Sequence, residues 1–545
     1  MKNSRLPHKI LISIFLLLTI SQPTKSQEIP HLRPKGNTTQ LIVDGKPFII
    51  LGGELGNSTA TTVENMKPVW PKLTAMNLNT VLIPVFWELV EEQEGVFEFG
   101  LYEELILEAR RNGMKIIFLW FGSWKNSMSS HAPGWVKLNQ NKYPRVKDDQ
   151  GVSQEILSSF SKNVLEADKK AFVKFMEFIR DFDGEEHTVI MVQVENEIGM
   201  LPTARDYQAL AEMAFQSNVP VELTKYLKKN RESLVPEFKE IWEKNGTRTG
   251  GNWEHIFGKG LYTDEIFMAW YYAQFANELT KAGKAVYPLP MFVNAALNRP
   301  NTPPGKYPSA GPLPHIMDVW KAGAPDIDFL SPDFYNPDFQ HWCDLYTRQN
   351  DPLFIPEHRF DETVAAKALF AIGRYEALGF APFSIESKAK PEEELLGRIY
   401  DLVDNLTPLI TSLHGEGKIK SVLLSKETQE EKIRLGKYEF TVKHNYTLSW
   451  TPGARLEEWP MASVMILQTG EDEFYVAGTG VVITMKTPDQ PQLRVGLLKV
   501  DEGHFEGGDW IVDRHLNGDQ THQGRHVSIP VGWVGTQRVE LYTYQ

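Results

Sequence analysis

The stretch that decides the fold is Val189-Ile190-Met191-Val192-Gln193-Val194-Glu195-Asn196-Glu197-Ile198-Gly199. It begins with an uninterrupted apolar run and ends in two carboxylates separated by an amide. A strand that is apolar at successive positions is buried on both faces, which is typical of a parallel sheet covered by helices. Ligands of parallel α/β proteins bind at the carboxyl ends of the strands, so this stretch predicts a functional site at its acidic end.

Similar apolar runs recur along the chain and alternate with helical patterns such as that of residues 170–180. The strands expected are Phe48–Glu54, Thr80–Trp87, Met114–Trp120, Val189–Val194, Met291–Asn294, Phe329–Phe334, Leu353–Pro356 and Ala381–Ile385. Eight strand–helix units that close on themselves form an α/β fold of the (β/α)₈, or TIM-barrel, type. A doubly wound open sheet is the alternative, but it rarely needs so many units.

Three segments are expected along the chain. Residues 27–413 should form the barrel, and residues 414–545 a β-sandwich, because helical periodicity stops there and short β-rich runs separated by turns follow. Residues 201–284 form an insertion in the fourth unit, which would lie at the mouth of the barrel. A surface subdomain with no role in binding is the alternative for this insertion.

Residues 1–26 have the pattern of a secretory signal peptide. Lys2, Arg5 and Lys9 precede an apolar run over residues 10–20, and small polar residues follow. The run is about half as long as a membrane-spanning helix requires. We therefore expect an exported, periplasmic or secreted protein without stable membrane insertion, and no cysteine follows the run to carry a lipid.

Composition narrows the classes of function. Hydrophobic residues are 42% and charged residues 23% of the 545, which indicates a folded globular chain. The net charge of −13 argues against nucleic acid as a partner. Cys343 is the only cysteine, and the chain has neither a phosphate-binding glycine loop nor a His-Glu-x-x-His motif. We expect no metal and no cofactor, and the oligomeric state is left open.

A second acidic strand end is Leu353-Phe354-Ile355-Pro356-Glu357. Glu357 lies far from Glu197 in sequence, so only a closed barrel would bring the two carboxylates together. A facing pair of carboxylates, one a proton donor of raised pKa and the other ionised, is what glycoside hydrolysis needs. The alternatives are a solvated turn at Glu197 and a structural ion pair of Glu357 with Arg359.

Three stretches carry a family resemblance. They are Gln193-Val194-Glu195-Asn196-Glu197-Ile198-Gly199, Val43-Asp44-Gly45-Lys46-Pro47-Phe48 leading to Gly52-Gly53-Glu54, and Phe86-Trp87-Glu88 with the following loop to Phe99. Over residues 40–410 the chain resembles glycoside hydrolase family 35, a family of clan A that consists mostly of β-galactosidases. Its carboxy-terminal part is similar to the accessory domain of a bacterial subset of that family.

The resemblance implies roles for individual residues. Glu197 would be the acid/base, Glu357 the nucleophile, and Asn196 would hydrogen-bond the 2-hydroxyl of the sugar. The substrate-binding residues implied are Asn196, Glu54, Trp87, Glu195, Trp124 and Tyr335. On the strand itself, alternation should place Glu195 and Glu197 on one face. The third-strand loop, Phe121-Gly122-Ser123-Trp124-Lys125-Asn126, departs from the family's usual galactose pocket.

The expected protein is a retaining exo-glycosidase that removes terminal β-D-galactosyl residues from an oligosaccharide or polysaccharide. One alternative is another clan A β-glycosidase, either a β-glucosidase or an endo-acting hemicellulase. The other is a non-catalytic glycan-binding protein on a hydrolase scaffold, against which the presence of both carboxylates and Asn196 counts.

Overall fold

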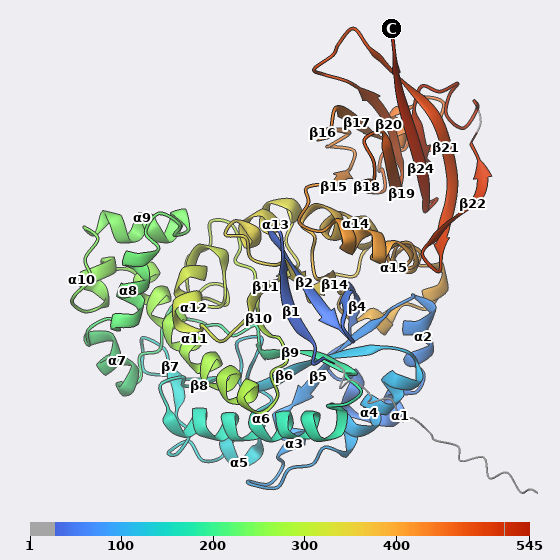
Figure 1. The fold of residues 1–545 in the computed structure, drawn as a ribbon. Coiled ribbons are helices and arrows are strands. Elements are labelled where there is room, and N and C mark those ends of the chain that lie inside the picture. The colour runs from blue at the N-terminus through green and yellow to red at the C-terminus, as the bar shows by residue number, and fades with distance from the viewer. Residues whose placement is uncertain (1–27, 517) are drawn as a thin grey trace, which may run out of the picture.

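The computed structural model describes residues 28–516 and 518–545 (Figure 1). The expected signal peptide, residues 1–26, lies outside the described residues. Over the described part, a helix-covered barrel is followed by two antiparallel sheets, so the predicted fold class is confirmed. Figure 1 shows the insertion helices and the carboxy-terminal sheets on different sides of the barrel.

The barrel is one sheet in which every neighbouring pair of strands is parallel. Its strands are β4 (Ile50–Glu54), β5 (Thr80–Phe86), β6 (Lys115–Lys125), β9 (Val189–Asn196), β10 (Met291–Ala296), β11 (Phe329–Phe334), β12 (Phe354–Ile355), β13 (Glu357–His358) and β14 (Gly379–Phe380). The seventh strand is divided into β12 and β13 at Pro356, which has no N–H to donate. Because β13 pairs with β11 and β12 pairs with β14, the divided strand closes the barrel.

The eighth strand differs from its expected position. Residues 381–385 were expected to be extended, but β14 ends at Phe380 and a 3₁₀ turn begins at Ile385. Pro382 cannot donate to a ladder, and Ser384 adopts a left-handed conformation with φ of 52°. The strand therefore ends early, and Phe383 turns toward the mouth of the barrel, where it lines a cavity.

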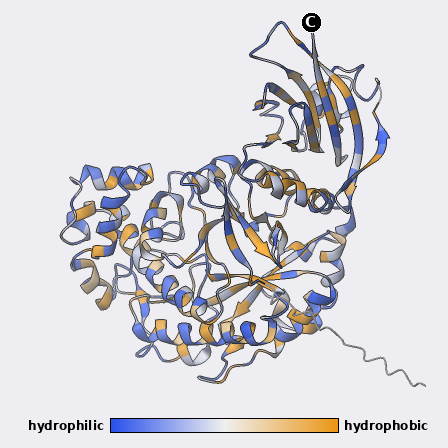
Figure 2. Cartoon of the chain, viewed as in Figure 1, coloured by the Kyte–Doolittle hydropathy of each residue, from blue (hydrophilic) through white to orange (hydrophobic). Residues whose placement is uncertain are grey.

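The barrel interior is filled by large apolar side chains contributed by strands all around it. Ile50, Leu82, Ile117, Phe292 and Phe329 belong to this buried cluster. A three-stranded antiparallel sheet, β1 (His31–Lys35), β2 (Thr38–Val43) and β3 (Lys46–Phe48), adds Leu41 and Val43 to it. A tight hairpin at Asp44-Gly45 joins β2 to β3, with Val43 paired to Lys46. Figure 2 shows the apolar residues gathered along these strands.

Helices and two short strands surround the barrel. They are α1 (Val63–Met66), α2 (Trp70–Ala75), α3 (Trp87–Val90), α4 (Gly100–Arg111), α5 (Gly134–Lys137), β7 (Arg145–Lys147), β8 (Ser153–Leu157), α6 (Lys162–Asp183), α11 (Leu261–Val286), α12 (Met317–Gly323), α13 (Phe339–Thr347), α14 (Val364–Arg374) and α15 (Leu395–Leu413). In α6, Ser161 caps the first turn by accepting from the Val164 N–H, and Phe172, Phe175 and Ile179 bury one face.

The fourth unit contains the additional helices expected there. They are α7 (Ala209–Gln216), α8 (Val221–Lys229), α9 (Pro236–Lys244) and α10 (Trp253–Phe257). The expected insertion, residues 201–284, is too long at its end, because α11 packs against α6 as a helix of the barrel. Buried Asp318 at the start of α12 attaches the insertion to the barrel by accepting from the Tyr226 hydroxyl (3.1 Å) and the Val235 N–H (2.7 Å).

After α15 the chain forms two antiparallel sheets. One contains β15 (Ile419–Leu424), β18 (Ala462–Gln468), β19 (Glu473–Thr479), β21 (Arg494–Glu506), β22 (Asp509–His515) and β24 (Gly535–Tyr544); the other contains β16 (Glu430–Leu435), β17 (Tyr438–His444), β20 (Val481–Lys486) and β23 (Val527–Ile529). Gly480, which has φ of 74°, separates β19 from β20. Both sheets contribute to one apolar core, as in a sandwich.

The sandwich packs on the barrel through α14, which Figure 2 shows to be largely apolar and which contacts β15 and β18. Gly373 of α14 lies so close to Ser421 of β15 that a Cβ would come within 2.8 Å of its side chain. Among residues 28–516 and 518–545, none of the helices combines the length and apolar character that crossing a bilayer requires.

Candidate active site

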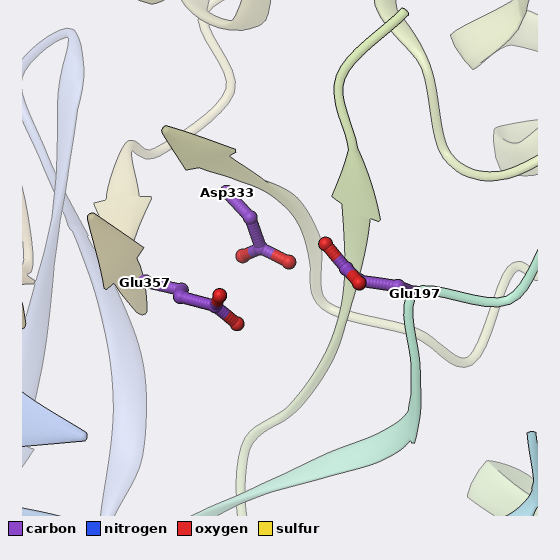
Figure 3. A group of neighbouring side chains, drawn as sticks. All are labelled: Glu197, Asp333 and Glu357. Carbon is purple, nitrogen blue, oxygen red and sulfur yellow. The ribbon is translucent and has the colours of Figure 1, made fainter. Parts of the chain in front are cut away.

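Three carboxyl groups converge at the carboxyl ends of the barrel strands (Figure 3). Glu197 directly follows β9, Asp333 belongs to β11 and Glu357 to β13. One carboxylate oxygen from each lies within 4.8 Å of those of the other two. Barrel closure thus brings together Glu197 and Glu357, as the sequence predicted, and adds Asp333, which the sequence did not single out.

The backbone at the end of β9 is irregular. Glu195 has φ of 61° and Glu197 has φ of 44°, a region that residues other than glycine rarely adopt. The Glu197 N–H donates to Asn294 Oδ1 at 2.9 Å, and Asn294 Nδ2 donates to Asp333 Oδ2 at 2.7 Å. Asn294 of β10 therefore positions Glu197 and Asp333 together.

The pKa of Glu197 is raised to about 7, first by burial and second by the negative charge of Glu357. Lys125 and hydrogen bonds from Asp333 and Asn126 act in the opposite direction and lower this pKa. The Asn126 amide donates to Glu197 Oε2. Near neutral pH, Glu197 is therefore close to half-protonated, which suits a group that must both give and take a proton.

Glu357 is almost wholly buried and receives a hydrogen bond from the Tyr335 hydroxyl. Burial and the charge of Glu357 raise the pKa of Tyr335, so this hydroxyl keeps its proton. Arg359 contacts the ring of Tyr335, with its guanidinium carbon 5.8 Å from the ring centre. The donor to Glu357 is thus a tyrosine, and the ion pair with Arg359 considered from the sequence is not formed.

Glu54, at the end of β4, faces Glu357 from below the cavity. Burial, followed by the charge of Glu357, raises the pKa of Glu54 well above its usual range. Burial and the charges of Glu357 and Glu197 do the same to the pKa of Asp333. The raised pKa of each carboxyl favours its neutral form, which can donate a hydrogen bond to a neighbouring carboxylate.

Lys125, at the end of β6, is the cation of this cluster. It is buried, its Nζ donates to Asn196 Oδ1 at 3.0 Å, and it lies 4.8 Å above the ring of Phe121. The spacing of the three carboxyls in Figure 3 would also suit a divalent cation. The charge of Lys125 beside these carboxyls offsets part of the negative charge that a metal needs.

Glu195 is directed away from this cluster, contrary to the expected shared face. Its carboxylate accepts from the N–H groups of Trp124 (2.8 Å) and Ser123 (3.3 Å) and lies beside Asp168 of α6. Asp168 in turn accepts from Trp120 Nε1 and from Ser123. Glu195 therefore fixes the β6 loop that carries Lys125 and Asn126, and the left-handed φ at Glu195 is the physical reason for its direction.

Two tryptophans expected to bind substrate are instead core residues. Trp87 begins α3, is fully buried, and donates from Nε1 to Glu91 Oε2 at 3.0 Å. Trp124 is fully buried against Tyr272 and Phe275. Neither lines the cavity, because the α3 turn and the β6 loop direct both rings outward into the helix layer.

A cavity of about 500 Å³ opens above the carboxyl cluster. Its lining includes Lys125, Asn126, Glu197, Asp333, Tyr335 and Glu357, with Arg299 and Tyr307 at one side. Asn196 lies just beneath it and contacts Lys125. Of the predicted site residues, Glu197, Glu357 and Tyr335 thus line one cavity, and Glu54 and Asn196 support its floor.

Comparison with known proteins links the amino-terminal part of this barrel to a family. Residues 40–257 match the model of glycosyl hydrolases family 35. Over these residues the barrel is similar to that family. The part that matches the family 35 model contains Glu54, Lys125, Asn196 and Glu197, but it ends before Asp333 and Glu357. Residues 396–528 match a domain of unknown function, DUF5597.

A beta-galactosidase of Xanthomonas manihotis is 28% identical to this chain over 210 residues. The match covers 36% of this chain and 32% of that relative, so it spans about a third of the relative's length. A solved beta-galactosidase from Bacillus circulans sp. alkalophilus has 13% identity and a TM-score of 0.45, over 66% of this chain and 57% of that one. The catalytic domain of a beta-amylase from Paenibacillus polymyxa also has 13% identity and a TM-score of 0.45. That match covers 65% of this chain and 97% of the beta-amylase domain.

Four polar residues of the site were not predicted from the sequence, and each lies at the end of a strand. Lys125 and Asn126 were noticed only as a departure from the usual third-strand loop, although a lysine after an apolar strand is itself a signal. Asn294 and Asp333 end expected strands five and six, and the same strand-end argument used for Glu197 would have found them.

Proposed function

We propose that this protein is a retaining glycoside hydrolase that removes terminal β-D-galactosyl residues by double displacement, with Glu197 as acid/base and Glu357 as nucleophile. The observation that carries the proposal is the short separation of their carboxylate oxygens, within 4.8 Å. Retaining enzymes hold the two carboxyls about 5–5.5 Å apart, whereas inverting enzymes need about 6.5–9.5 Å to admit a water. The galactosyl specificity is supported by the family and by the activity named for its relative.

In the first step Glu197 donates its proton to the glycosidic oxygen while the Glu357 carboxylate attacks the anomeric carbon. The bond to the leaving sugar breaks, and a covalent glycosyl–Glu357 ester forms. The Glu197 carboxylate then takes a proton from water, whose oxygen attacks the anomeric carbon and releases Glu357. Tyr335 donates a hydrogen bond to Glu357, Glu54 lies beside Glu357, and Asn126 and Asp333 orient Glu197.

The stereochemical course tests this proposal. Hydrolysis of p-nitrophenyl β-D-galactoside followed by proton NMR should show β-galactose as the first product, before mutarotation. First appearance of α-galactose would rule out Glu357 as the nucleophile. A panel of nitrophenyl glycosides measured beside it separates galactosidase from other β-glycosidase activity, and complete inactivity on the panel would favour a binding protein.

If the carboxyl of Glu54 is neutral and donates to Glu357, replacing Glu54 by glutamine and by alanine should affect activity differently. Glu54→Gln keeps a donor beside Glu357, whereas Glu54→Ala leaves the charge of Glu357 with one donor fewer. We expect kcat/KM on p-nitrophenyl β-D-galactoside to be about tenfold or more lower in Glu54→Ala than in Glu54→Gln, the value of one hydrogen bond to a charged group. Equal losses in the two variants would show that Glu54 acts through its shape or its charge instead.

We also propose that the protein is exported, on the basis of the basic, apolar and small-residue pattern of residues 1–26. Cell fractionation with sequencing of the amino terminus tests this. A protein recovered in the cytoplasm with Met1 retained would contradict it.

A further inference from the structure

A second, larger cavity of about 930 Å³ lies between the insertion and the barrel. One wall is formed by α9 and by Tyr262 at the start of α11, and the other by residues 298–303 and by Trp342 of α13. Arg299 and Tyr307 line both this cavity and the catalytic cavity. The two spaces therefore adjoin, and we call the second one the insertion groove.

We propose that the insertion groove binds the sugar chain on the leaving-group side of the bond that is cleaved, so that the natural substrate is an oligosaccharide or polysaccharide rather than a small galactoside. This inference rests on the proposed function. The insertion then takes part in substrate selection. The alternative considered from the sequence was a surface subdomain with no role in binding.

The position of Glu197 decides which side of the substrate enters the groove. The segment that follows Glu197 is paired with the segment that carries Tyr307, because Met200 N–H donates to Ser309 O at 2.8 Å and Ser309 N–H donates to Met200 O at 3.2 Å. The acid therefore lies on the groove side of the catalytic cavity. A leaving sugar departs toward the group that protonates it, so the remainder of its chain would extend into the groove.

The lining of the groove suits a sugar chain. The ring of Tyr262 is 57% exposed and offers a flat surface for the apolar face of a sugar. Asn298 Oδ1 is buried and accepts no hydrogen bond from the described residues, and the Arg299 guanidinium forms no hydrogen bond or ion pair with them. Sugar hydroxyls can donate hydrogen bonds to Asn298 Oδ1 and accept them from the Arg299 guanidinium.

The groove is held in shape before any ligand binds. Asp318 attaches α8 and the residue before α9 to α12, and Arg348 after α13 pairs with Glu237 of α9 at 3.0 Å. Buried Glu265 of α11 accepts from the Tyr307 hydroxyl at 2.7 Å and pairs with His315 at 2.9 Å, which fixes the wall shared by the two cavities. A preformed groove binds its ligand more tightly because few protein side chains or loops must become ordered on binding.

The test compares substrates of increasing length. We expect kcat/KM of the intact protein to rise about tenfold or more from β-1,4-galactobiose to β-1,4-galactopentaose. In Tyr262→Ala and in Arg299→Ala this rise should fall to less than about threefold, since one well-placed aromatic or arginine contact is worth a factor of about ten. Tyr544→Ala, which removes a 44% exposed ring on the sandwich, is the matched control and should keep the full rise.

Activity on p-nitrophenyl β-D-galactoside separates the two proposals. If the aryl galactoside is cleaved but the intact protein gains nothing from longer chains, the groove proposal is overturned while the proposed function stands. A rise with length that persists in both groove variants also overturns it. If no β-galactoside is cleaved, the proposed function itself fails.

Discussion

Replacement of Glu357 by glutamine is expected to reduce turnover of every β-galactoside by about 10⁴- to 10⁶-fold, the range seen when a member of a catalytic unit is removed. The amide has the shape of the carboxyl but cannot form the ester with the anomeric carbon. Because the step lost is covalent bond formation, substrates with good and poor leaving groups should suffer alike. Steady-state rates with p-nitrophenyl and alkyl β-D-galactosides give the measurement.

The control for this variant is Glu362→Gln, a change of the same kind at an exposed position five residues further along the chain. It should keep the parent activity, and thermal unfolding of both variants should resemble that of the parent. Residual activity of Glu357→Gln within about a hundredfold of the parent would remove Glu357 from the role of nucleophile.

Replacement of Glu197 by alanine should have an effect that depends on the leaving group. Loss of a general acid costs about 10²- to 10⁴-fold when the leaving oxygen needs a proton. A dinitrophenyl leaving group needs none, so its release should be nearly preserved, and added azide should take the place of the activated water and yield β-galactosyl azide. Equal losses on dinitrophenyl and alkyl galactosides would exclude Glu197 as the acid.

The pH dependence of the parent follows from the same residue. Glu197 must be protonated for the first step, and its pKa is raised to about 7, so kcat/KM should fall as the pH rises through about 7. Burial is the larger cause of this raised pKa and the charge of Glu357 the second. In Glu357→Gln, infrared titration of Glu197 should therefore show a pKa that is lower than in the parent but still above that of an exposed glutamate. An unchanged pKa would show that burial alone controls the acid.

The carboxyl cluster illustrates why charge balance cannot be derived from strand ends alone. Glu54, Glu197, Asp333 and Glu357 would repel one another if all were ionised, and Lys125 is the cation beside them. The cluster is tolerable because burial and mutual repulsion raise the pKa values of Glu54 and Asp333, which favours their neutral forms, and because Asn294 and Tyr335 donate hydrogen bonds. These protonation states depend on distances across the barrel, which no local pattern contains.

The irregular end of β9 also shows a feature that a local sequence pattern does not predict. Alternation along a strand predicts that Glu195 and Glu197 share a face, and the left-handed backbone at both positions breaks that rule. Glu195 instead supports the β6 loop from behind, and Lys125 and Asn126 of that loop enter the cavity. The expectation for Trp87 and Trp124 fails for a related reason. The direction of an aromatic side chain near the end of a strand depends on the loops around it, which the local sequence does not place.

The sequence by itself determined the periodic features of this protein: the alternation of buried strands with amphipathic helices, the change to β-rich texture after Leu413, and the acidic strand ends at Glu197 and Glu357. Each of these features can be predicted from residues that are close in the sequence, because burial on one or both faces of an element requires apolar residues at regular spacing. Only the tertiary structure decided which side chains meet. Closure of the barrel at Pro356, the left-handed turns at Glu195 and Glu197, and the groove beside the insertion depend on contacts between residues far apart in the sequence. In such contacts packing and electrostatics, not local propensity, set the outcome.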